Sequence, residues 1–200
     1  MKRLIATFAL ACAAGAVTAQ ELIPQEDLDK GVPRALARVA DFDNLPIKTD
    51  ADGAKAFGMK AKQYAAVVIP DKGLTKEALA KAGKEVVPVG QLWLIKLSPA
   101  VKDATTANDK LRLVTISVKD EDHRLSLLLL GARKAGEKDL ELVIYAKAKE
   151  PLLTLPLKQS DTKQALPLEI GLRQGTSSLG LVDINILGEY QAVLPVGEQE

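Results

Sequence analysis

The chain has 200 residues, of which 27 are basic and 26 are acidic, and its formal net charge is +1 at pH 7. This balance gives no strong positive field, so composition disfavours nucleic acid as a partner. Hydrophobic residues make up 47 % of the chain, which is typical of a folded globular protein and argues against global disorder.

The N-terminal segment has the three parts of a secretory signal peptide. Residues 1–3 carry two positive charges, an apolar run extends from Leu4 to Ala14, and small residues end at Ala19. The apolar run is too short for a permanent membrane helix, which needs about 20 residues. We therefore expect cleavage after Ala19 and export from a bacterial cell to the periplasm or the outside, with no integral membrane segment in the mature chain.

Cys12 is the only cysteine, and it lies within this leader. A lipoprotein hypothesis would make it the lipidated residue, but the residue three before it is Ala9 rather than leucine. We interpret Cys12 as a small apolar residue of the leader. The mature chain is then cysteine-free, so we expect neither disulfides nor a thiolate metal site.

Residues 20–85 are expected to form a mixed region of helix, short strand and irregular chain. A helix is predicted from Leu28 to Asp41, with Pro33 in its first turn, where a missing N–H costs nothing. A strand is predicted over Ala65–Ile69. A second helix is predicted over Thr75–Lys84, because the hydroxyl of Thr75 can cap its first turn.

From residue 86 onward, apolar and polar residues alternate with the period of a β-strand. His123–Leu130 becomes apolar on both faces from Leu127, which predicts a central, buried strand. Pro156 interrupts a later run and is expected at a sheet edge. The alternating sets each predicted to share one strand face include Trp93, Ile95 and Leu97; Val114, Ile116 and Val118; Leu140, Leu142, Ile144 and Ala146; Leu166, Leu168, Ile170 and Leu172; and Val182, Ile184 and Ile186.

Short alternating strands separated by Gly, Pro and Asp turns predict an antiparallel sandwich or a small barrel. We favour an antiparallel β-sandwich, Ig-like or similar, because two packed sheets explain why one face of each strand is apolar. The fold class is thus mainly β with a short mixed α and irregular N-terminal region. The expected organisation is a leader (1–19), an N-terminal region packed on the sandwich (20–85) and an antiparallel β domain (86–200).

Two acidic segments contain candidate metal ligands. His123 is the only histidine and stands close to Asp120 and Asp122, but adjacent strand residues point to opposite faces and do not all converge. Asp50 and Asp52 resemble half of a calcium loop, although the first and last ligand positions of that loop lack suitable oxygens. A solvated turn and a plain Asp-rich loop are the alternative interpretations.

The sequence contains no convincing catalytic pattern. A Ser-His-Asp triad would have to use His123, and no serine lies in a G-x-S-x-G elbow. Acidic residues are plentiful, but nothing selects one pair as the two carboxylates of a glycosidase. No cofactor is expected.

Tyr145 is the candidate for a partner surface. It lies on the polar face of its predicted strand, beside Glu141 and Lys147, where an exposed tyrosine is typical of interfaces. The alternative is a half-buried ring that packs across strands.

These features predict an exported, non-enzymatic β-sandwich protein that binds a protein, a cell-envelope component or a small ligand. One alternative is an exported carboxylate-dependent hydrolase, which could use calcium. The other is a carrier of a small apolar ligand, which an empty apolar cavity inside the β domain would favour and a filled core would reject.

Overall fold

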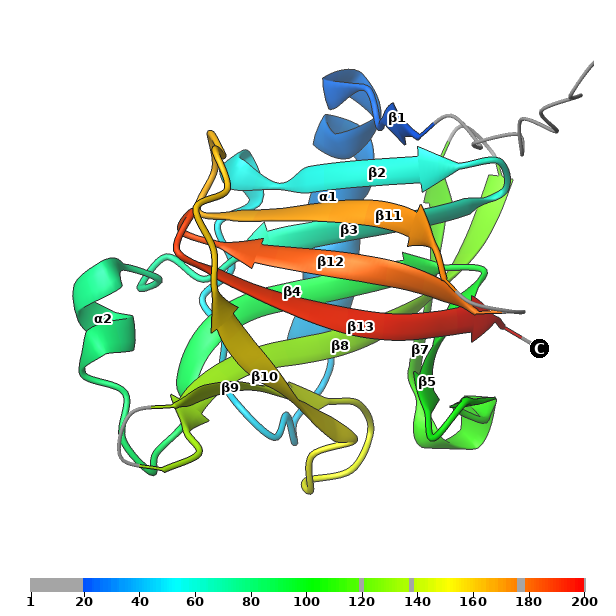
Figure 1. Cartoon of the computed structure of the whole chain (residues 1–200). Coiled ribbons are helices and arrows are strands. Elements are labelled where there is room, and N and C mark those ends of the chain that lie inside the picture. Colours follow the sequence, from blue (N-terminus) through cyan, green and yellow to red (C-terminus); the bar gives the residue numbers. More distant parts are fainter. Residues whose placement is uncertain (1–19, 119–120, 137–138, 176–178, 200) are drawn as a thin grey trace, which may run out of the picture.

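The computed structural model describes residues 20–118, 121–136, 139–175 and 179–199 and shows a mainly β protein with helices α1 (Gln25–Ala40) and α2 (Lys76–Ala80) (Figure 1). The predicted leader with Cys12 and the candidate ligand Asp120 lie outside the described residues. The strands are β1 (Glu21–Leu22), β2 (Phe57–Ala61), β3 (Tyr64–Pro70), β4 (Val87–Ile95), β5 (Leu97–Val101), β6 (Ala104–Thr105), β7 (Arg112–Val118), β8 (Glu121–Lys134), β9 (Leu140–Tyr145), β10 (Leu153–Gln159), β11 (Leu168–Gln174), β12 (Gly180–Ile186) and β13 (Tyr190–Glu198), and the short 3-10 helices are η1 (Gly53–Lys55) and η2 (Asn108–Lys110).

The strands form one antiparallel sheet that curls into a half-barrel. Its order is β1-β2-β3-β4-β8-β9-β10-β13-β12-β11, and β5, which follows β4 in the chain, pairs with β13. The end strand β11 lies beside β2 (Figure 1). The prediction of a mainly β protein is confirmed, whereas the two-sheet sandwich is not. The alternation did not distinguish the two folds, because a single curled sheet also turns one face of each strand inward.

The inside of the curl is filled by apolar side chains that we term the inner cluster. They come from alternate positions of β3, β4, β8 and β9 and of the C-terminal strands β11, β12 and β13, as alternation predicts. Fully buried members include Val68, Leu92, Leu128, Leu130, Ile144, Ile184 and Leu194.

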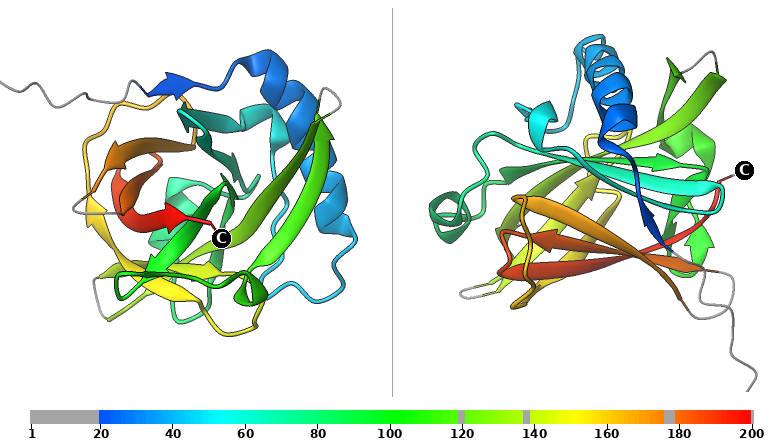
Figure 2. Two further views of the ribbon diagram at one scale, coloured as in Figure 1. Left: turned by 90° about the vertical axis from the view of Figure 1, so that its right-hand side faces the viewer. Right: turned by 90° about the horizontal axis from the view of Figure 1, so that it is seen from above.

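The opposite face of the sheet carries a second set of buried side chains, the outer cluster, which α1 covers in part (Figure 2). The buried members of the outer cluster are Leu28, Val32, Ala35, Val39, Ala56, Val67, Ile69, Trp93, Val114, Ile116, Leu125, Leu127, Leu129, Val143 and Tyr145. Those that α1 contributes recur every three or four residues, so they form one stripe along the helix.

Helix α1 begins at Gln25, three residues before its predicted start, so the prediction that Pro33 lies in the first turn is wrong. Pro33 lies inside the helix, where it removes the hydrogen bond to the carbonyl of Asp29. Both residues lie on the exposed face. Water can therefore satisfy that carbonyl, while the buried stripe holds the helix against the sheet.

Strand β8 is the central strand of the sheet, as predicted. It pairs with β4 along one edge and with β7 and then β9 along the other. Its residues Leu125–Ala132 are buried on both faces. Leu127 and Leu129 belong to the outer cluster, and Leu128 and Leu130 belong to the inner cluster, so one run of leucines supplies both.

The chain bends between β4 and β5 at Lys96, whose φ is 56°. This left-handed conformation interrupts the period of two, and the side chains that follow point to the other face. The prediction that Trp93, Ile95 and Leu97 share one face is therefore wrong. Trp93 belongs to the outer cluster, and Leu97 belongs to the inner cluster.

The sheet crosses the expected boundary between residues 85 and 86. Strand β3, from the N-terminal region, pairs along its length with β4, so that Val67 lies opposite Trp93. The two regions thus share one sheet and both clusters. Within the described residues, no helix is long and apolar enough to span a bilayer.

Helix α2 is shorter than predicted but begins where expected. The hydroxyl of Thr75 accepts a hydrogen bond from the amide of Ala78 at 3.1 Å. Leu79, which is 1 % exposed, anchors the helix in the inner cluster.

We expect Thr75→Ala to lower the free energy of unfolding by about 1 kcal/mol, because the amide of Ala78 loses its partner. Thr75→Ser keeps the hydroxyl and should keep the stability. Urea unfolding of the two variants checks this, and equal losses in both would show that the cap contributes nothing.

Candidate functional site

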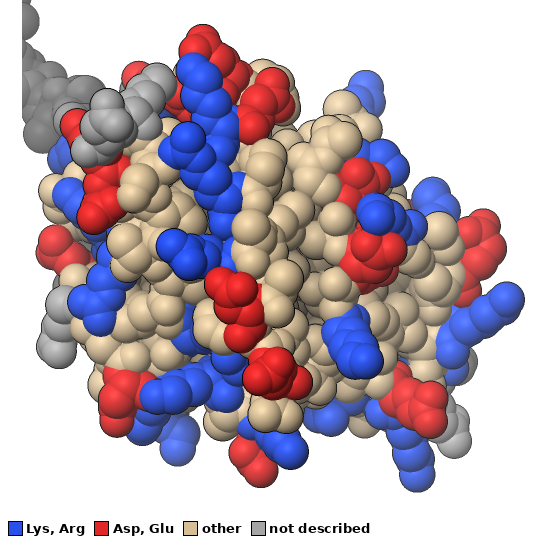
Figure 3. Space-filling model, turned by 180° about the vertical axis from the view of Figure 1, so that it is seen from behind, with Lys and Arg blue, Asp and Glu red and all other residues tan. Residues whose placement is uncertain are grey.

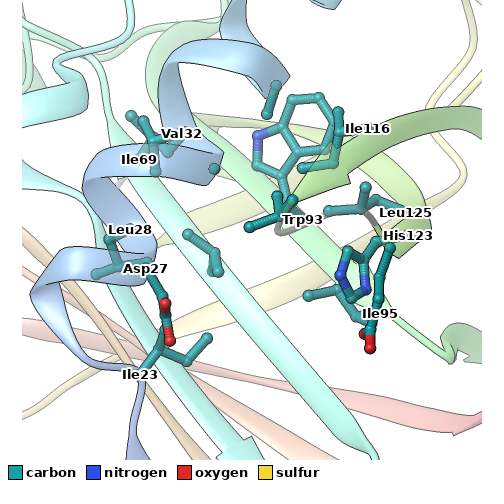
Figure 4. Close-up of a pocket in the computed structure, with 15 residues that line it drawn as sticks. Ile23, Asp27, Leu28, Val32, Ile69, Trp93, Ile95, Ile116, His123 and Leu125 are labelled. Carbon is teal, nitrogen blue, oxygen red and sulfur yellow. The ribbon is translucent and has the colours of Figure 1, made fainter.

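A cleft of about 350 Å³ lies between the buried side of α1 and the outer face of the sheet (Figure 4). Its walls come from α1, from the residue Ile23 before that helix, and from β3, β4, β7 and β8. The described residues that line it are Ile23, Asp27, Leu28, Gly31, Val32, Ala35, Val67, Ile69, Trp93, Ile95, Ile116, Val118, Glu121, His123 and Leu125. Most are apolar, so the cleft suits an apolar ligand.

The space beneath α1 exists because two of its residues that face the sheet are small. Gly31 and Ala35 lie one helical turn apart and both line the cleft. A Cβ atom built on Gly31 would meet only the Cγ2 atom of Val118, at 3.9 Å. Leu28 and Val32, which also line the cleft, are buried in the outer cluster and pack the helix against the sheet.

Trp93 is held in one orientation at the cleft. Its side chain is 1 % exposed, and its Nε1 donates a hydrogen bond to Oε1 of Gln91 at 3.1 Å. The amide of Gln91 donates in turn to Oγ1 of Thr49 at 2.9 Å. Because these polar groups satisfy one another, Trp93 presents apolar surface to the cleft.

Three titratable side chains, those of Asp27, Glu121 and His123, line the cleft. Asp27 comes from the first turn of α1, and the other two come from the start of β8. Figure 4 shows Asp27 on the α1 side and His123 on the β7–β8 side. Glu121 is exposed, whereas Asp27 and His123 are half-buried, so Glu121 marks the solvent-exposed edge of the cleft.

The register of β7 and β8 determines which residues of this hairpin face the cleft. Ile116 pairs with His123, and Val118 pairs with Glu121. The side chains of cross-strand partners point to the same face of a sheet. His123 and Glu121 therefore lie on the same face as Ile116 and Val118, which is the face toward α1. Arg34 of α1 donates to the backbone carbonyl of Ser117, which ties the helix to the hairpin.

The structure does not bring the candidate metal ligands together. Asp50 pairs with Lys72 at 2.8 Å, and Asp52 pairs with Lys55 at 3.0 Å. The hydrogen bond with Asp50 is the main cause that raises the pKa of Lys72 above its ordinary value. The carboxylate of Asp71 organises this loop, because it accepts hydrogen bonds from the backbone amides of residue 50 at 2.7 Å and of residue 73 at 2.8 Å.

The second candidate group is divided by strand alternation. His123 faces the cleft, whereas Asp122 accepts a hydrogen bond from the hydroxyl of Ser117 at 2.5 Å on the other face. Asp120 is not among the described residues. Over the described ranges, no group of three or more His, Cys, Asp or Glu side chains is placed to hold a metal ion.

Tyr145 is 7 % exposed and belongs to the outer cluster. Its ring is therefore buried, whereas the predicted partner surface requires an exposed ring. The strand pattern suggested exposure because Glu141 and Lys147 flank it, but the outer cluster covers this part of β9, which also buries Val143.

Two further hollows have more polar linings. One, of about 400 Å³, lies by the C-terminal end of α1 and includes Lys48, Thr49 and Gln91. The other, of about 370 Å³, lies by η2 and includes Asp109, Lys147 and other charged residues. The apolar cleft is therefore the better candidate for ligand binding.

Sequence reasoning identified His123 but missed the cleft to which it belongs. The available signal was the pair of small residues Gly31 and Ala35 within an otherwise bulky stripe. Both residues lie inside the predicted helix, but interpreting them as one wall of a cleft requires knowing which helix face packs on the sheet. No family model matches this chain, and no curated protein or solved structure matches it either.

Proposed function

We propose that the protein is an exported, non-enzymatic binding protein that holds a small apolar ligand in the cleft beneath α1. The observation that carries this proposal is the cleft itself, with its volume of about 350 Å³ and its mostly apolar lining. Ligand pockets of this kind are usually about 300–1,000 Å³, apolar, and supplied with a few polar groups that orient the ligand. Trp93 and the polar residues at the β7–β8 hairpin fit those two roles.

The ligand site lies outside the curl of the sheet. The carrier expected from the sequence, with its ligand inside the β domain, is rejected, because side chains such as Leu92, Leu128 and Ile184 fill that space and are fully buried. On the outer face, Gly31 and Ala35 leave space between α1 and the sheet, whereas the inner cluster is filled by side chains. The proposed carrier thus uses the helix and the sheet together as the two walls of its site.

The proposed place of action is the periplasm or the outside of the cell. The support is the leader pattern of residues 1–19, with two positive charges before an apolar run. An apolar molecule that crosses an aqueous compartment benefits from a protein that covers it, because exposed apolar surface is unfavourable in water.

We expect 1-decanol to raise the thermal unfolding temperature of the purified protein. A ligand at 100 times its dissociation constant, if it binds only the folded state, adds about 2.7 kcal/mol of stability. Titration calorimetry and the emission of Trp93, the single tryptophan, measure the same binding directly. A flat melt and no heat of binding would reject the proposed function.

Gly31→Leu tests whether binding occurs at this cleft. The new side chain should occupy the space next to Val118 and weaken 1-decanol binding at least about tenfold, while its better helix propensity protects the fold. Ala37→Leu is the matched control, because residue 37 lies on the exposed face of α1. Equal binding by both variants would place the ligand elsewhere.

A further inference from the structure

The charged groups at the cleft indicate which head group an apolar ligand carries. Among the described residues that line the cleft, Asp27 and Glu121 bear charge, and both are acidic. No lysine or arginine is among these described lining residues.

The basic side chains of α1 are not among the described residues that line the cleft, and Arg34 donates a hydrogen bond to the backbone carbonyl of Ser117 on β7. Lys30, Arg34 and Arg38 are exposed. Lys30 pairs with Glu26, and Arg38 lies 3.7 Å from Asp41. Figure 3 shows Lys and Arg side chains gathered over this region among Asp and Glu, so the outer side of α1 carries both signs of charge.

The position of Glu121 suits contact with a ligand head group at the edge of the cleft. It opens strand β8 and pairs with Val118, whose side chain also lines the cleft. The neighbouring apolar residues Ile95 and Leu125 extend inward from there, since both line the cleft and Leu125 is 4 % exposed. A molecule with an apolar tail among these residues would bring its polar end to the carboxylates.

We propose, on the basis of the proposed function, that the ligand is an amphiphile with a cationic head group, its alkyl tail beneath α1 and its ammonium beside Glu121 at the β7–β8 edge of the cleft. Opposite charges a few ångströms apart attract even in a solvated setting, and a carboxylate head group at the same place is repelled. The site therefore prefers alkyl ammonium compounds over alcohols, and alcohols over fatty acids of equal length.

The test compares decyltrimethylammonium, 1-decanol and decanoate by titration calorimetry at pH 7, below their micelle concentrations. The ammonium should bind most tightly and the carboxylate most weakly. Glu121→Gln should weaken the ammonium by about threefold and leave 1-decanol unchanged, in keeping with the modest strength of exposed ion pairs. Glu121→Lys should reverse the order of the two charged ligands.

Asp122→Asn is the matched control. It removes the same charge from the adjacent residue of β8, whose side chain lies on the opposite face and bonds Ser117. It should leave all three affinities unchanged. If 1-decanol binds but decanoate binds as tightly as the ammonium, or if Glu121→Gln behaves like Asp122→Asn, the head-group inference is overturned and the carrier function stands. If none of the three ligands binds, both fail.

Discussion

Leu128→Ala is expected to lower the free energy of unfolding by about 3 kcal/mol, within the range measured for leucine truncation in well-packed cores. Leu128 is fully buried in the inner cluster and lies opposite Leu92 of β4. It occupies the middle of β8, where backbone pairs on both sides restrain the strand, so the surroundings have little freedom to close the cavity.

Urea unfolding followed by circular dichroism measures this loss. Leu22→Ala is the matched control, because Leu22 is 62 % exposed on the short edge strand β1 and its truncation should cost no more than about 0.5 kcal/mol. Similar losses in the two variants would mean that the inner cluster is not the main source of stability.

Gly90→Ala is expected to destabilise the protein by about 3 kcal/mol or more, through the backbone rather than through lost packing. Gly90 has a φ of 152°, which L-residues rarely adopt. It lies where the register between β4 and β8 shifts. A Cβ atom there would stand 2.3 Å from the carbonyl oxygen of Ile69 and 2.9 Å from the Cα of Pro70, so β3 and β4 would have to move apart.

Gly83→Ala provides the comparison for Gly90→Ala. Nothing lies within 4 Å of a Cβ atom built on Gly83. The same substitution there should be neutral or should stabilise by up to about 1 kcal/mol, since it restricts the unfolded chain. Thermal unfolding distinguishes the two sites, and a stable Gly90→Ala variant would contradict the described contact between β3 and β4.

The sequence contains enough information to predict the strands, but less to predict how they assemble. The leucine run of β8 and the set Val114, Ile116 and Val118 were placed correctly because hydrophobic alternation is a local signal. Strand β2 was missed because its alternation, with Phe57, Met59 and Ala61 on one face, extends over only five residues and includes a glycine, a residue depleted in strands. Neither the left-handed Lys96 nor the closing contact of β11 with β2 has a local signature, so the curled sheet was taken for a sandwich.

The candidate site was only partly predictable for the same reason. His123 was singled out as the only histidine, and its local acidic neighbours suggested a metal ligand. The other walls of its cleft come from α1, β3, β4 and β7, and α1 lies about ninety positions earlier in the chain. Strand alternation separates it from Asp122, and the spacing of Gly31 and Ala35 does not by itself reveal which strands lie beneath the helix.

The sharing of β8 between the inner and outer clusters has a consequence for folding. Its successive leucines point into different cores, so neither core can melt while the other keeps this strand in place. We therefore expect the two hydrophobic cores to unfold as one cooperative unit, and we expect local opening to be limited to peripheral elements such as β1.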